Sequence, residues 1–120
     1  SEELCAGTGH DFDEQRQRAR IQAILARTDS SASMFNHGLL RVREDWTGRF
    51  RDIDCPVLIV HGEDDPILPV ENGNALAAGI TDAELLVLKG IGHELPLLTI
   101  PVILEHLATH VQQTDGMPLR

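Results

Sequence analysis

The run Pro56-Val57-Leu58-Ile59-Val60-His61, which ends at Gly62, most strongly limits the folds open to this chain. Its apolar residues are nearly continuous rather than alternating, which is typical of a strand covered on both faces, as in a parallel sheet. Pro56 fits the first position of such a strand, because proline lacks the N–H that a central position must donate. The run therefore predicts a buried strand over residues 56–61.

The segments that follow this strand predict one parallel βαβ unit closed by a last helix. Short apolar patterns predict a helix over residues 71–79 and a second strand over 84–88. Pro101 is expected in the first turn of the last helix, where its missing N–H costs nothing. Its predicted buried side comprises Ile100, Ile103, Leu104, Leu107 and Val111. The fold class is therefore α/β, since strands alternate with helices in this order.

Upstream of the sheet the pattern is helical. Residues 13–28 combine good helix formers with apolar residues near helical spacing, which predicts one helix. Phe35, Leu39, Val42 and Trp46 lie on one face of a second predicted helix. We expect three parts: a helical cap-like segment over residues 1–50, the C-terminal βαβα portion of a parallel sheet over 51–113, and a tail over 114–120.

Chemically active residues follow both predicted strands. The first strand ends in Gly62-Glu63-Asp64-Asp65-Pro66-Ile67-Leu68-Pro69, and the second leads into Gly90-Ile91-Gly92-His93. Adjacent parallel strands lie about 5 Å apart and their carboxyl ends share one sheet edge, so a carboxylate and an imidazole can meet there. An Asp paired with a His fixes the imidazole tautomer. The alternative is that His93 is an ordinary hydrogen-bonded loop residue. We expect His61 to be a packed or hydrogen-bonded residue at the end of the first strand.

These motifs resemble the C-terminal part of the α/β-hydrolase superfamily, over a little under half of the chain. The resemblance rests on the strand ending in His61-Gly62, on G-x-x-D-x-x-x-P, and on G-x-G-H. Asp64-Asp65-Pro66-Ile67-Leu68-Pro69 and the stretch from Gly90 to Pro96 are also similar to the aclacinomycin methylesterase branch of esterases. The resemblance implies that Asp65, rather than Asp64, is the acid of a Ser-Asp-His triad and that His93 is its base.

The nucleophile of such a triad is absent from this sequence. There is no G-x-S-x-G motif, and serines occur only at positions 1, 30, 31 and 33. There is no oxyanion-hole stretch either. Because nucleophile and oxyanion donors supply the covalent chemistry and the largest electrostatic stabilisation, the chain is expected to be inactive by itself as a hydrolase.

Charge and composition exclude several other classes. The formal net charge is −9 with no basic patch, which disfavours nucleic acid and anionic membranes as partners. No apolar stretch is long enough for a membrane span, and no signal peptide is evident, so a cytoplasmic protein is expected. Cys5 and Cys55 form no CxxC pair. His106 and His110 lack the Glu of H-E-x-x-H and are expected on a solvated face. We predict no metal and no cofactor.

Three functions stay open from the sequence. The first is esterase-like acyl hydrolysis of a small-molecule ester by the complete protein. The second is a non-catalytic βαβ interaction module. The third is another reaction of the same fold, since haloperoxidases, C–C hydrolases and dehalogenases share this C-terminal pattern. Because two strands alone expose unpaired edges, the expected partner is a missing N-terminal half or a second copy of the chain.

Overall fold

The computed structural model describes residues 5–30, 32, 36, 39–40 and 47–115. The chain divides into two compact units. Residues 1–11 and 48–120 form the first, which we call the core unit, and residues 12–47 form the second, which we call the helical unit. None of the described helices is long and apolar enough to cross a membrane.

The helical unit contains α1, Glu14–Ala26. Asp13 caps its N-terminus, because the Asp13 side chain accepts a hydrogen bond from the backbone N–H of Arg16 at 2.9 Å. None of the residues of α1 is buried. The helix predicted over residues 13–28 is therefore confirmed. The second predicted helix falls mostly on residues outside the described part of the chain, including Phe35, Val42 and Trp46.

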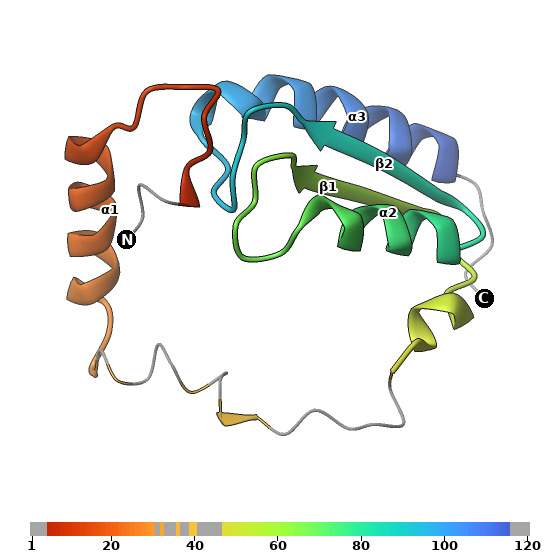
Figure 1. Cartoon of the computed structure of the whole chain (residues 1–120), viewed down its shortest axis with the longest axis horizontal. Coiled ribbons are helices and arrows are strands. Elements are labelled where there is room, and N and C mark those ends of the chain that lie inside the picture. Colours follow the sequence, from red (N-terminus) through yellow and green to blue (C-terminus); the bar gives the residue numbers. More distant parts are fainter. Residues whose placement is uncertain (1–4, 31, 33–35, 37–38, 41–46, 116–120) are drawn as a thin grey trace. The chain divides into compact units, whose positions relative to one another are not determined.

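The core unit is a two-stranded parallel sheet with helices, as Figure 1 shows. Its elements in chain order are the 3₁₀ turn η4 (Arg49–Asp52), β1 (Val57–Gly62), α2 (Val70–Gly79), β2 (Ala83–Leu88), the 3₁₀ turn η5 (Leu97–Thr99) and α3 (Ile100–Thr114). The register runs from Val57 opposite Ala83 to Gly62 opposite Leu88. The predicted βαβα order and the α/β class are confirmed.

Helices α2 and α3 cover opposite faces of this sheet. The His61 ring lies against Gly73 of α2, whereas Glu84 pairs with His106 of α3. Glu84 stands opposite Leu58 in the register, and Leu58 differs from His61 by an odd number of residues. Because successive side chains of a strand point to opposite faces, the two helices lie on different sides. The sheet is thus the middle layer of an α/β/α arrangement.

The core of this unit is small, and the prediction that the first strand is buried on both faces was wrong. The buried apolar side chains are Ala6, Ile80, Leu88 and Ile91. Residues 57–61, predicted to be buried on both faces, are only half-buried. The physical reason is that β1 and β2 are the two strands of the described sheet. Two strands leave edges and parts of both faces uncovered.

The predicted buried side of α3 was wrong at four of its five positions. Ile100, Leu104, Leu107 and Val111 are 39%, 56%, 43% and 49% exposed. Of the predicted set, Ile103 is half-buried as expected, and the other half-buried positions of the helix are Val102, His106, His110 and Thr114. His106 and His110 therefore do not lie on a solvated face: the His106 Nδ1 is 2.7 Å from the Glu84 carboxylate. Ile100, Leu104, Leu107 and Val111 thus form an exposed apolar stripe beside the half-buried row.

Candidate active site

Two loops leave the carboxyl ends of β1 and β2 side by side. Gly62 and Leu88 pair at the ends of their strands. Beyond them the Glu63 N–H donates to the Leu88 carbonyl at 3.0 Å, and the Asp64 N–H donates to the Ile91 carbonyl at 2.9 Å. A Cβ at Gly62 would overlap the carbonyl oxygens of Ile91 and Gly92, so this close approach requires glycine. The sheet edge thus fixes the distance between the two loops.

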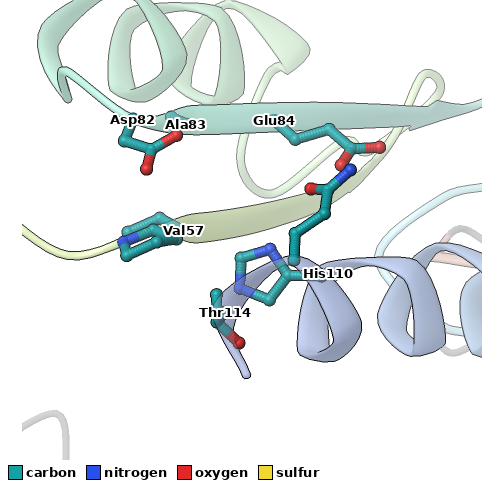
Figure 2. A pocket seen from close by; sticks show the side chains of 8 residues that line it. Val57, Asp82, Ala83, Glu84, His110 and Thr114 are labelled. Atoms are coloured by element: carbon teal, nitrogen blue, oxygen red, sulfur yellow. The ribbon is translucent and has the colours of Figure 1, made fainter. Parts of the chain in front are cut away.

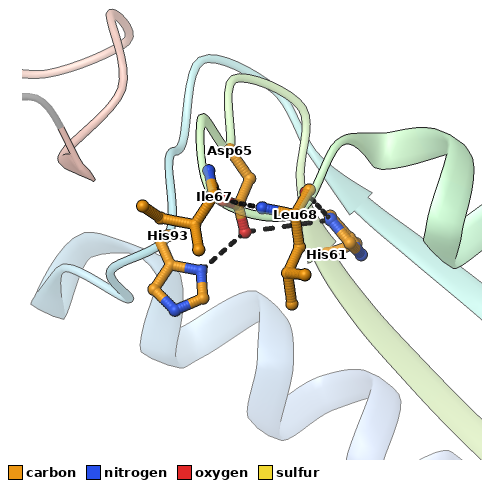
Figure 3. Close-up of polar contacts among 5 residues, drawn as sticks. All are labelled: His61, Asp65, Ile67, Leu68 and His93. Carbon is orange, nitrogen blue, oxygen red and sulfur yellow. Dashed lines mark hydrogen bonds and ion pairs between the residues drawn. The ribbon is translucent and has the colours of Figure 1, made fainter. Parts of the chain in front are cut away.

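This packing brings Asp65 and His93 together, as Figure 3 shows. The His93 Nδ1 lies 2.8 Å from the Asp65 Oδ2. Asp65 has a side chain that is 7% exposed, while that of His93 is 45% exposed. The second oxygen of Asp65, Oδ1, accepts the backbone N–H groups of Ile67 at 2.8 Å and Leu68 at 2.9 Å. The carboxylate is therefore held on one side by its own loop and presented to the imidazole on the other.

The pKa of the Asp65 carboxyl lies below its ordinary value of 3.8. Burial by itself raises this pKa, but hydrogen bonds from the Leu68 amide, from His93 and from the Ile67 amide outweigh it, together with the charge of His93. Asp65 is therefore ionised at neutral pH and can only accept hydrogen bonds. Consequently the His93 Nδ1 carries the hydrogen, and in the neutral ring Nε2 keeps a lone pair that can take a proton.

The sequence did not single out the two amides that hold Asp65. Asp65 is followed by Pro66, and an Asp before a proline is a common start of a turn in which the carboxylate accepts the next backbone N–H groups. That local signal was sufficient to predict the support from Ile67 and Leu68. It also explains why the carboxylate keeps one defined orientation in an otherwise exposed loop.

Asp64, the other candidate for the acid, has a different partner. Its Oδ2 accepts the backbone N–H of Thr8 at 3.1 Å and also the Thr8 hydroxyl. Thr8 belongs to a segment that runs along the second loop. There Gly92 donates to the Ala6 carbonyl at 3.0 Å, and Gly9 donates to the Gly90 carbonyl at 2.6 Å. Asp64 thus ties the N-terminal segment to the site, in a contact that the predicted cap-like segment over residues 1–50 did not anticipate.

A separate pocket lies at the other end of the strands, as Figure 2 shows. Its lining comprises Pro56, Val57, Asp82, Ala83, Glu84, His110, Gln113 and Thr114. These residues come from the starts of β1 and β2 and the end of α3. The pocket therefore contains neither Asp65 nor His93. Among the residues that the structure describes, no group of three or more His, Cys, Asp or Glu side chains is placed to hold a metal ion.

Comparison with known proteins places the chain in a family. Residues 41–112, more than half of the chain, match the family described as TAP-like protein. A 2-hydroxy-6-oxononadienedioate/2-hydroxy-6-oxononatrienedioate hydrolase of Cupriavidus pinatubonensis is 30% identical over 63% of this chain and 27% of its own length. A non-heme haloperoxidase of Rhodococcus erythropolis is 42% identical over 41% of this chain and 18% of its own.

A bifunctional esterase/perhydrolase of Acinetobacter calcoaceticus is 32% identical over 57% of this chain and 25% of its own length. The chain thus spans less than a third of these relatives. Their names cover several reactions and do not single out the methylesterase branch. The family match, the relatives and the parallel βαβα order agree, and the chain belongs to the TAP-like family of the α/β-hydrolase superfamily.

Proposed function

We propose that this chain supplies the acid and the base of a serine-type hydrolase that cleaves esters or related acyl compounds. Asp65 is the acid and His93 is the base. The observation that carries this proposal is the 2.8 Å contact between an almost buried carboxylate and a half-exposed imidazole. The order along the chain also supports it, because in hydrolases with a G-x-S-x-G nucleophile the acid precedes the histidine.

In this proposal His93 transfers the protons of the reaction. Its Nε2 accepts the proton of the serine hydroxyl as the serine oxygen attacks the acyl carbon. Asp65 stabilises the resulting imidazolium. The ring then protonates the leaving oxygen, and the acyl-serine ester remains. Water then attacks the acyl carbon while the same Nε2 takes its proton. The bond to the serine oxygen breaks, the ring returns the proton to that oxygen, and the carboxylic acid leaves.

The nucleophile in this proposal comes from outside the 120 residues, because they contain no G-x-S-x-G. The exposed stripe of Ile100, Leu104, Leu107 and Val111 supports a second polypeptide segment or a second copy lying against α3. The same stripe favours the alternative of a non-catalytic interaction module. The two functions differ in whether a reactive serine accompanies the chain. The relatives' names also leave haloperoxidase-type and C–C bond hydrolysis open for the same acid and base.

Labelling with a fluorophosphonate and hydrolysis of a p-nitrophenyl ester test the proposal. We expect no labelling of the 120-residue chain, and no faster ester hydrolysis than by its His93→Gln variant. The polypeptide extended by the upstream coding sequence should be labelled at one serine and lose hydrolysis on His93→Gln. An extended polypeptide without a reactive serine would support the interaction module. Hydrolysis that is unchanged by His93→Gln would contradict the role of His93.

A further inference from the structure

His61 lies beside the acid but has no role in the proton transfers described above. It is the penultimate residue of β1, and its side chain is 11% exposed. On one side the ring meets α2 at Gly73, where an added Cβ would lie 2.9 Å from the His61 Nδ1. On the other side it faces the loop of Asp65, as Figure 3 shows. The ring therefore fills a defined space between a helix and the acid loop.

The His61 ring is joined to the acid through Leu68. The His61 Nε2 lies 2.7 Å from the Leu68 carbonyl oxygen. A carbonyl only accepts hydrogen bonds, so the ring donates from Nε2. The backbone N–H of the same Leu68 donates to the Asp65 Oδ1 at 2.9 Å. The His61 Nε2 is 3.8 Å from the Asp65 Oδ2, too far for a hydrogen bond but within ion-pair distance when the ring is protonated. The hydrogen-bonded route from the ring to the carboxylate therefore runs through Leu68.

We propose that His61 is a positioning residue for the acid: it anchors the Leu68 carbonyl, which keeps the Ile67 and Leu68 amides on one Asp65 oxygen and leaves the other to His93. This inference rests on the proposed function of Asp65 and His93. It assigns His61 no contact with substrate and no proton transfer.

The exposure of the loop supports an anchor of this kind. Ile67 and Leu68 are 57% and 50% exposed, so their side chains contribute little packing that would fix the backbone. The backbone of this loop is held by its hydrogen bonds to Asp65 and His61. Gly73 leaves room for the His61 ring, because a Cβ at this position of α2 would push the ring out of its place. The hydrogen bonds thus connect His61 of β1 through Leu68 to the Asp65 carboxylate.

The test measures Asp65 directly in the 120-residue chain. Carbon-13 NMR follows the titration of the Asp65 carboxyl, and the amide signals of β1 and β2 report that the fold persists at each pH. In the wild type we expect a midpoint below 3.8. His61→Gln retains an N–H donor but carries no charge, and it should keep a low midpoint; a midpoint raised as far as in His61→Phe would assign the effect to the ion pair and contradict the anchor. His61→Phe has no donor and should raise the midpoint, because the loop amides no longer stay on the carboxylate.

Two further variants separate positioning from general destabilisation. Ile80→Val removes one methylene from the core at the end of α2 and should leave the Asp65 midpoint unchanged, although it costs stability. Gly73→Ala should raise the midpoint as His61→Phe does, and it decides the question if His61→Phe does not fold. A midpoint in His61→Phe and Gly73→Ala equal to that of Ile80→Val would overturn the proposal.

This experiment is independent of catalysis, because it reads protonation rather than hydrolysis. If the Asp65 midpoint did not shift in His61→Phe, His61 would have no positioning role, and the proposed acid and base would be unaffected. A shifted midpoint in a polypeptide without a reactive serine would support the anchor and contradict the proposed hydrolase. The proton position on the His93 ring, read by NMR at alkaline pH, gives a second readout for variants that unfold in acid.

Discussion

Asp65→Asn is expected to lower kcat of the proposed hydrolase, meaning this chain extended by a segment with the proposed serine, by about 10⁴-fold. An Asn side chain can turn its NH₂ group toward the His93 Nδ1, which then accepts rather than donates. The ring would carry its hydrogen on Nε2, where it cannot take the serine proton. The effect is large because the contact that is changed lies at 2.8 Å and involves a carboxylate that is almost buried.

The matched control is Asp64→Asn, which makes the same change one residue earlier. Asp64 contacts Thr8, and Asp65 contacts His93. We expect Asp64→Asn to retain kcat within about 10-fold of the wild type, since it leaves the imidazole tautomer unchanged. Steady-state kinetics with a p-nitrophenyl ester compares the two variants. Equal losses in both, or a larger loss in Asp64→Asn, would mean that the acid has been assigned to the wrong carboxylate.

Gly62→Ala is expected to separate the two loops of the site. The added methyl group would meet the backbone carbonyls of Ile91 and Gly92, which cannot rotate away as a side chain can. Overpacking of this kind lowers the free energy of unfolding by about 1–3 kcal/mol. The hydrogen bond from the Asp64 N–H to the Ile91 carbonyl would lengthen. The distance between Asp65 and His93 would increase with it. Urea denaturation of the 120-residue chain measures the stability loss.

Gly79→Ala serves as the control for this substitution. A Cβ at Gly79 meets the ring of Phe50, a side chain that can move. Gly79 also lies at the end of α2, where alanine favours the helix. We therefore expect Gly79→Ala to cost less stability than Gly62→Ala. If Gly62→Ala unfolded at the same urea concentration as the wild type, the loops would not be packed as closely as described.

The parts of the fold that the sequence predicted are those governed by local pattern. The apolar run before Gly62 and the pattern around Leu88 sufficed for two strands, because strand pairing in a βαβ unit follows from the chain order. Asp65 and His93 could be expected to meet for the same reason. Both stand a few residues beyond strand ends that share one edge, and the glycine at 62 allows the two loops to approach.

The parts that the sequence did not predict depend on contacts between distant segments. The apolar stripe of α3 identified a helix, but which row faces the sheet was decided by contacts such as that of His106 with Glu84, 22 residues away. The segment around Ala6 has no pattern of its own, and its place beside Gly92 follows from backbone hydrogen bonds. Such bonds require no particular residue type, so they leave little trace in a sequence.

The proton position on the His93 ring tests the central claim most directly. Long-range proton–nitrogen NMR of the 120-residue chain at alkaline pH, where imidazole rings are uncharged, distinguishes the two tautomers. An ionised Asp65 that accepts from Nδ1 predicts that His93 carries its hydrogen on Nδ1 in the wild type and shifts it to Nε2 in Asp65→Asn. A wild-type ring with its hydrogen on Nε2, unchanged by Asp65→Asn, would contradict the pairing of Asp65 with His93.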